Sequence, residues 1–187
     1  MKSLILYRSE YGSTEQYARW IGEELSSQHD VIDNLSKYDM EDYDLIIVGE
    51  GVYAGQMKAA KRLVPIIERY PDKRFIFFIV GIADMEDKVN RDKLYSDLAK
   101  AMGPAIEKTK VFFLRGVLDY SKMNLKHKSM MWMLVNYLKK KPKKDLPKDG
   151  DQLISTYGKK VSFIDKKSIE PLVEFAKGKL PDENIEP

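Results

Sequence analysis

Three short segments of this chain are apolar through their centres, without polar alternation, and each is followed by a loop and a helical pattern. They are Leu4–Tyr7, Asp44–Gly49 and Phe75–Val80. Continuously apolar strands are buried on both faces, as in a parallel sheet that helices cover on both sides. Because ligands of such sheets bind beyond the carboxyl ends of the strands, we expect the loops after these three strands to form one site.

The segments between and after these strands complete an alternating order of strands and helices. Apolar side chains recur at three- and four-residue spacing in the expected helices, and Pro65 should kink or shorten one of them. The order predicts right-handed crossovers and a doubly wound, five-stranded parallel sheet of the α/β class. The expected helices are 14–27, 57–69, 89–101, 124–141 and 168–177, the further strands are 31–35 and 110–117, and a short segment at 161–165 precedes the last helix.

The loop after the first strand has the composition of an anion-binding turn. Residues 8–14 include the hydroxyl side chains of Ser9, Ser13 and Thr14 and one glycine, and they lead directly into the first helix. Loop amides and the positive end of a helix dipole converge there, which favours a phosphate group. No lysine follows Gly12, so the loop is not of the Walker type. The simpler interpretation is a helix cap at Ser13, completed by Gln16, and it stays open.

The loops after the other two buried strands suit a flat ring system. Residues 49–56 contain three glycines, which let the backbone approach closely, and Tyr53, which can lie against a ring face. Alternatively, this loop is a glycine-rich turn with a surface tyrosine. The backbone of residues 81–87 could bond the polar edge of such a ring, whereas Asp87 is expected to cap the next helix.

In sequence and order the three loops resemble those of the flavodoxin family, beginning with the pattern Ser9-x-x-Gly12-x-Thr14. The resemblance runs from residue 2 to about residue 117, and it implies a 2-1-3-4-5 strand order and non-covalent FMN. It implies that the FMN phosphate is held by Ser9, Glu10, Tyr11, Gly12, Ser13 and Thr14. It also implies that the isoalloxazine ring is covered by Val52, Tyr53, Ala54, Gly55 and Gln56, and that its pyrimidine side contacts Gly81, Ile82, Ala83 and Asp84. Val52 and Ala54 depart from the usual form of the second loop.

Composition narrows the chemistry of the site and the cellular location. The 187 residues include no cysteine and two histidines, which argues against disulfides, iron–sulfur clusters, a thiol nucleophile and a zinc site. No apolar run is long enough to span a membrane, and we expect a cytoplasmic protein. We predict one domain over residues 1–178, followed by an exposed tail over residues 179–187.

The basic charge of the chain is concentrated in one segment. Residues 115–148 hold ten Lys or Arg and two Asp, although the net charge is only +3. Within an insertion predicted at 122–149, the expected helix has an apolar, methionine-rich middle between lysines. It is a core helix on a sheet face, or a helix that docks on anionic lipid through Trp132 and Tyr137, or a mixture of the two. Its aromatic residues are not interleaved with the lysines, so specific nucleic-acid binding is not expected.

This basic helix and the elements after it resemble one flavodoxin branch, the menaquinone-dependent protoporphyrinogen dehydrogenases. The resemblance implies an FMN oxidoreductase that passes electrons to a quinone, with peripheral contact to the inner face of the cell membrane through residues 122–148. The alternative is an electron carrier with a redox partner protein and no substrate of its own. A third reading is an interaction domain of the same shape without flavin. No residue stands out as a catalytic acid, base or nucleophile.

Overall fold

A five-stranded parallel sheet forms the centre of the computed structural model, which describes residues 1–53 and 57–179. The strand order is β2-β1-β3-β4-β5, so the predicted order and the predicted α/β class are confirmed. The register places Tyr7 beside Gly49 and Gly49 beside Phe78, so the carboxyl ends of the three inner strands lie level. In chain order the strands are β1 (Ser3–Arg8), β2 (Gln28–Val31), β3 (Leu45–Gly51), β4 (Arg74–Gly81) and β5 (Thr109–Arg115).

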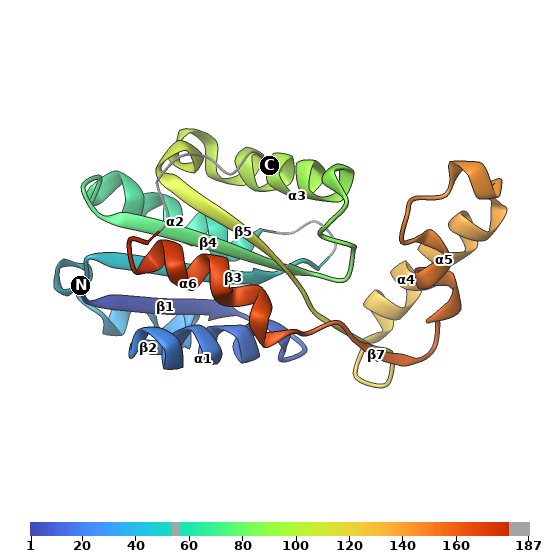
Figure 1. The fold of residues 1–187 in the computed structure, drawn as a ribbon, viewed down its shortest axis with the longest axis horizontal. Coiled ribbons are helices and arrows are strands. Elements are labelled where there is room, and N and C mark those ends of the chain that lie inside the picture. Colours follow the sequence, from blue (N-terminus) through green and yellow to red (C-terminus); the bar gives the residue numbers. More distant parts are fainter. Residues whose placement is uncertain (54–56, 180–187) are drawn as a thin grey trace.

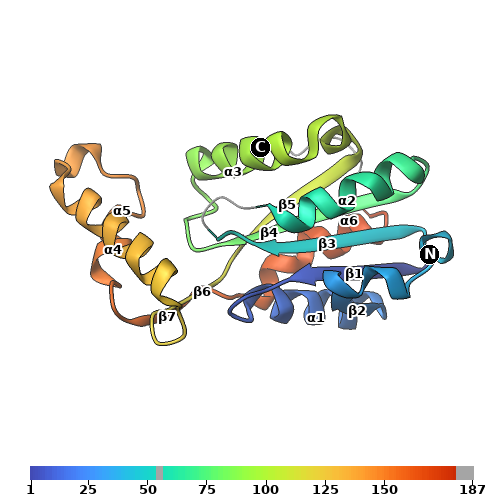
Figure 2. The same cartoon turned by 180° about the vertical axis from the view of Figure 1, so that it is seen from behind.

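Helices cover both faces of this sheet (Figures 1 and 2). The helices on one face are α1 (Ser13–Leu25) and α6 (Glu170–Ala176), and those on the other are α2 (Lys58–Arg69) and α3 (Lys88–Met102). Successive side chains of β1 alternate between the two cores: Leu4 and Leu6 pack toward α2 and α3, and Ile5 packs toward α1 and α6. Burying each such side chain contributes about 1.5–3 kcal/mol, which explains why the inner strands are apolar throughout.

The strand predicted at 31–35 is wrong, because β2 ends at Val31 and a 3-10 turn follows. The Asp30 carboxylate accepts hydrogen bonds from the Val31 N–H at 2.7 Å, from Asn34 Nδ2 at 2.8 Å and from the Tyr38 hydroxyl at 2.9 Å. These bonds turn the chain out of the sheet directly after β2. The strand itself is short, polar and at the edge, so it lacks the apolar signal that marks the inner strands.

The predicted helices are present with small shifts at their ends. Pro65 is predicted to kink or shorten its helix; it lies inside α2, which runs from Lys58 to Arg69 and is therefore not shortened. The segment before α6 is a 3-10 turn, and Pro171 stands in the first turn of α6, where its missing N–H costs no hydrogen bond. The 3-10 turns are η1 (Ile32–Lys37), η2 (Met40–Asp42), η3 (Gly103–Lys108), η4 (Lys143–Asp145) and η5 (Lys166–Ile169).

Residues 117–162 form a lobe that projects beyond the carboxyl ends of the strands (Figures 1 and 2). The strand predicted at 110–117 breaks at Gly116, whose N–H donates to the Gly81 carbonyl at 2.8 Å and whose carbonyl accepts from the Phe163 N–H at 3.1 Å. These two bonds tie both strands of the lobe's stem to the sheet. The lobe consists of β6 (Val117–Asp119), α4 (Leu125–Lys140), α5 (Gly150–Ser155) and β7 (Lys160–Ser162), with β6 and β7 paired antiparallel.

The basic helix of the lobe does not cover a sheet face, so the expectation of a core helix at that place is wrong. Helices α1 and α6 cover one face of the sheet, and Leu172 and Phe175 of α6 are buried there. α4 instead turns Met131 toward Leu118 and Tyr120 at the base of the lobe and packs against α5. Its limits agree with the prediction, because Asn124 caps its start and Lys141 ends it.

Candidate functional site

The loop between β1 and α1 is a tight turn that opens directly onto a helix N-terminus. Gly12 has a φ of 89°, which favours glycine, and its N–H donates to the Ser9 hydroxyl at 3.0 Å. Gly12 is also the N-cap residue of α1, without a side-chain cap. The simpler interpretation of this loop, a cap at Ser13, is therefore wrong. Ser13 lies in the first turn, where its hydroxyl accepts from the Val117 N–H at 3.0 Å.

One polar atom of this turn is buried without a partner. Thr14 is fully buried, and within the described residues its hydroxyl has no hydrogen-bond partner. A buried hydroxyl that makes no bond costs about 1–3 kcal/mol. Its place at the start of a 13-residue helix, where backbone N–H groups point outward, is the place where an anion binds favourably. The residues present therefore fit a phosphate group.

The loop after β3 is anchored by a buried carboxylate that the sequence analysis missed. Glu50 is fully buried and accepts hydrogen bonds from the backbone N–H groups of Lys58 at 2.8 Å, Ala59 at 2.9 Å and Ala60 at 3.3 Å. Arg8 contacts the same carboxylate at 3.4 Å. Burial raises the pKa of the Glu50 carboxyl, while these amides and Arg8 act in the opposite direction. Glu50 thus caps α2 from the end of β3 and joins both ends of the loop.

Tyr53 leans from this loop over the first one. Its hydroxyl accepts a hydrogen bond from the Glu10 N–H at 3.1 Å, and its ring meets the Tyr11 ring edge-on, with centroids 5.4 Å apart. Burial raises the pKa of the Tyr53 hydroxyl, so it keeps its proton at neutral pH. Gly51 makes room for this ring, because a Cβ at that position would lie 2.6 Å from the Tyr53 hydroxyl.

The lobe contributes a histidine to this cluster. His127, in the first turn of α4, stacks on the Tyr53 ring at 5.6 Å with an interplanar angle of 16°. Its Nδ1 lies 2.5 Å from the Tyr11 hydroxyl and 3.7 Å from the Glu10 carboxylate. Asn124 accepts the His127 backbone N–H at 2.8 Å. The sequence carried no signal for this contact, because 116 residues separate Tyr11 and His127 along the chain.

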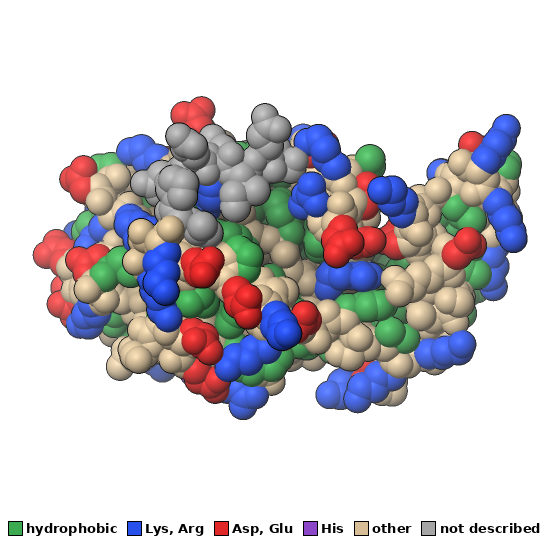
Figure 3. All heavy atoms as spheres, in the orientation of Figure 1, with side chains coloured by type: hydrophobic (Ala, Val, Ile, Leu, Met, Phe, Trp, Pro, Cys, Tyr) green, Lys and Arg blue, Asp and Glu red, His purple; other side chains and the backbone are tan. Residues whose placement is uncertain are grey.

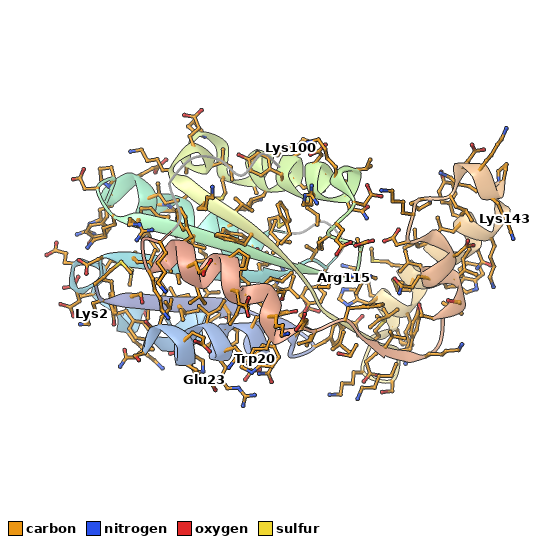
Figure 4. All side chains as sticks on the ribbon, viewed as in Figure 1. Lys2, Trp20, Glu23, Lys100, Arg115 and Lys143 are labelled. Carbon is orange, nitrogen blue, oxygen red and sulfur yellow. The ribbon has the colours of Figure 1, made fainter. Side chains whose placement is uncertain are left out.

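The loop after β4 also reaches the lobe. The Asp84 N–H donates to the buried Asp149 carboxylate at 3.1 Å, and the Asp84 carboxylate accepts the Glu86 N–H at 3.0 Å. Asp87 accepts the Val89 N–H at 3.0 Å and caps α3, as predicted. Arg115, at the junction of sheet and lobe (Figure 4), donates to the Ile82 carbonyl at 3.2 Å.

The sheet brings the described members of the predicted loop residues to one edge, where the lobe adds His127 and Asp149. The loop after β3 is also bonded to the end of β4, because the Val52 N–H donates to the Val80 carbonyl at 2.9 Å. The predicted residues Ala54, Gly55 and Gln56 lie outside the described residues. In the described part of the chain, no group of three or more His, Asp or Glu side chains is arranged to hold a metal ion.

Comparison with known proteins gives one family and several related proteins. The model of the family described as "Flavodoxin domain" matches residues 4–145. The uncharacterized protein MJ0298 of Methanocaldococcus jannaschii is 37% identical over 108 residues, which cover 55% of this chain and 72% of that protein.

Similar solved structures include two flavoproteins from bacteria. A flavoprotein from Lactobacillus acidophilus, solved in complex with FMN, has a TM-score of 0.40 and 18% identity, with 61% of this chain and 91% of that chain covered. Oxidised flavodoxin 2 from Bacillus cereus has a TM-score of 0.42 and 19% identity, with 62% and 84% covered.

Proposed function

The chain belongs to the flavodoxin domain family, and from this premise we propose that it binds FMN non-covalently and carries electrons through it. The family match, residues 4–145, includes all three loops of the candidate site. The observation that carries the proposal is the buried Thr14 hydroxyl, which lacks a partner in the described chain at the start of α1. A phosphate monoester would accept a hydrogen bond from this hydroxyl and others from loop amides.

Each loop has a distinct part in this proposal. Ser9–Thr14 would hold the phosphate, and the Tyr53 ring would pack against the isoalloxazine ring of FMN. Gly81–Asp84 would contact the polar edge of the isoalloxazine ring. Glu50 fixes the loop that carries Tyr53 by its bonds to the start of α2. FMN, when bound, supplies one- and two-electron redox chemistry. The protein would bind it, orient it and limit the access of water.

We further propose that the protein is an oxidoreductase of the protoporphyrinogen-dehydrogenase type that passes electrons to a quinone. The support is the lobe, which places an apolar and basic surface beside the candidate site. α4 has no acidic residue, and its outward-facing side chains Trp132, Met133 and Tyr137 are 58%, 56% and 58% exposed. Figure 3 shows Lys and Arg side chains at several places on the lobe's visible surface, between apolar and other atoms.

Such a surface suits the interface of a bilayer that contains anionic lipid, where quinones dissolve. Trp and Tyr prefer the headgroup level, and each lysine near an anionic surface adds about 1 kcal/mol. No described helix is both long and apolar enough to cross a membrane. We therefore propose peripheral contact with the inner face of the cell membrane, made through α4 and its flanking lysines.

The second candidate is an electron carrier with a redox partner protein and no substrate of its own. Membership of the flavodoxin domain family favours it, because the family match covers the cofactor loops and requires no substrate site. A stable half-reduced state during reductive titration would support the carrier. Direct two-electron turnover of a small substrate would support the enzyme.

The first experiment is a visible spectrum of the purified protein before and after FMN is added. Bands at about 370 and 450 nm that stay with the protein through gel filtration would establish the cofactor. Reduction of menaquinone by the loaded protein, with protoporphyrinogen as donor, then tests the enzyme. A protein that retains no FMN would contradict the redox proposal, and a loaded protein that reduces no quinone would contradict the enzyme proposal alone.

A further inference from the structure

His127 joins the lobe to both loops that are proposed to hold FMN. It bonds or approaches two residues of the phosphate loop, Tyr11 and Glu10, and it stacks on Tyr53 of the ring loop. Its side chain is only 13% exposed, although α4 lies in a lobe that projects from the sheet. The lobe therefore reaches back to the candidate site at this residue.

The polar contacts of His127 fix the plane of its ring. Nδ1 is held by the Tyr11 hydroxyl at 2.5 Å, and the Glu10 carboxylate lies at 3.7 Å on the same nitrogen. The backbone of His127 is fixed too, because its N–H donates to the side chain of Asn124 at the cap of α4. Because the ring nitrogen and the backbone of His127 are both fixed, the face of its ring keeps one orientation toward the neighbouring ring.

That neighbour is Tyr53. The two rings are nearly parallel, at 16°, and Tyr11 closes the cluster by meeting both of them edge-on, at 76° to His127 and 78° to Tyr53. The Tyr53 hydroxyl is held separately by the Glu10 N–H. His127 thus limits the rotation of Tyr53, whose hydroxyl is held by Glu10 and whose ring lies at a steep angle to that of Tyr11.

We infer that His127 is a positioning residue for FMN binding: it holds the ring of Tyr53 in the orientation in which that ring meets the flavin. The inference rests on the proposed FMN site. It assigns to the lobe a role in cofactor binding that is separate from membrane contact. Support of Tyr53 requires a planar side chain at position 127, because stacking needs a planar face. The hydrogen bonds of His127 serve to orient that face.

The test compares FMN affinity, measured by quenching of flavin fluorescence, among substitutions at one position. His127→Ala and His127→Gln should weaken binding about three- to tenfold, which is the scale of one aromatic contact. His127→Phe keeps a planar ring and should stay within about twofold of the wild type. Ser129→Ala, an exposed position on the same helix, is the matched control and should also stay unchanged.

Three results would overturn the inference. Unchanged affinity in His127→Ala would show that Tyr53 needs no such support. Tighter binding in His127→Ala would show that the histidine competes with the flavin for the face of Tyr53. Weaker binding in His127→Phe, equal to that of His127→Ala, would assign the effect to the hydrogen bonds and would likewise contradict the stacking role.

A second readout needs no cofactor. The chain has two histidines, so the ring protons of His127 and His29 are readily separated in a proton NMR spectrum. Tyr53→Leu should shift the His127 ring signals by removing the ring current of Tyr53, and it should leave the His29 signals in place. Unshifted His127 signals would overturn the inference. A protein that shows this shift but retains no FMN would instead contradict the proposed function.

Discussion

The carboxylate of Glu50 accepts a hydrogen bond from the Lys58 N–H at 2.8 Å, and this bond joins the two ends of the loop that carries Tyr53. A helix usually receives its cap from the residue just before it. α2 instead receives its cap from the end of β3, eight positions earlier. The proposed ring loop is thereby tied to the sheet and to the helix at the same point.

Glu50→Ala should destabilise the protein by about 2–4 kcal/mol, because three backbone N–H groups at the start of α2 lose a buried acceptor. Urea denaturation of the cofactor-free protein measures this loss. The control is Asp39→Ala, which removes an exposed carboxylate that caps the three-residue turn η2. A loss at Glu50 no larger than that at Asp39 would contradict the anchoring role.

The pH dependence of stability provides a second test of Glu50. Burial raises its pKa in the folded protein, so the folded state holds this proton more strongly than the unfolded chain. The group then adds stability below the ordinary pKa of an unfolded glutamate, and this contribution is lost as the pH rises through the raised value. Glu50→Gln removes the titration but keeps the shape.

The quantity to follow is the unfolding free energy of the wild type minus that of Glu50→Gln. It should be larger at about pH 4.5 than at about pH 7.5, because other titrating groups cancel in the difference. A difference that grows toward neutral pH would indicate that the amides and Arg8 outweigh the cost of burial.

Thr14→Val should have opposite effects on the free and the loaded protein. Valine keeps the size of threonine and removes a buried hydroxyl that has no partner in the described chain, so the cofactor-free protein should gain about 1 kcal/mol of stability. FMN affinity should fall about tenfold with the loss of one bond to a charged phosphate. Thermal unfolding with and without FMN measures both effects. Thr14→Ser, which keeps the hydroxyl, should retain the affinity, and equal affinities in all three proteins would argue against phosphate at this turn.

The inner sheet could be predicted from sequence because burial on both faces leaves a local signal. β1, β3 and β4 are apolar through their centres. The strand order is implied by the resemblance to the flavodoxin family. β2 carries no such signal, because its residues 28–31 lie at the exposed edge. The turn that replaced the predicted strand depends on bonds from one side chain, Asp30, to positions up to eight residues away.

The residues of the candidate site also divide into those that could be predicted from the sequence and those that could not. The loops could be predicted, because glycine and hydroxyl residues directly follow apolar strands. Glu50, His127 and Asp149 could not, because each acts on a partner that only the fold brings near. The placement of α4 could not be predicted either: its composition fits a buried helix, whereas α6 packs on the sheet face and α4 lies in the lobe.

The exposed aromatic residues of α4 should govern binding to lipid. The double substitution Trp132→Ser and Tyr137→Ser removes the outward rings and should weaken sedimentation with anionic vesicles about tenfold or more. Raising the salt concentration should weaken wild-type binding as well, because the lysines act through charge. Val89→Ser is the control, since Val89 is an exposed apolar residue, 72% exposed, on α3. Equal losses in both proteins, or binding to neutral vesicles alone, would contradict docking through α4.

A substitution at Gly51 tests the position of the Tyr53 ring while Tyr53 itself stays unchanged. A Cβ on residue 51 would lie 2.6 Å from the Tyr53 hydroxyl, which is too close for both to stay. The backbone at residue 51 is ordinary strand and accepts alanine, so the tyrosine ring must move. Gly51→Ala should therefore cost about 1–3 kcal/mol, the usual scale of overpacking, and should weaken FMN binding.

A double-mutant cycle separates this effect from a general disturbance of β3. If the cost of Gly51→Ala arises from displacement of the Tyr53 ring, it should largely vanish in a Tyr53→Ala background, because the space is then empty. The coupling energy should be about 1 kcal/mol or more, as for residues in direct contact. If the stability costs of Gly51→Ala and Tyr53→Ala simply add, the alanine strains β3 itself. The position of Tyr53 would then not depend on Gly51.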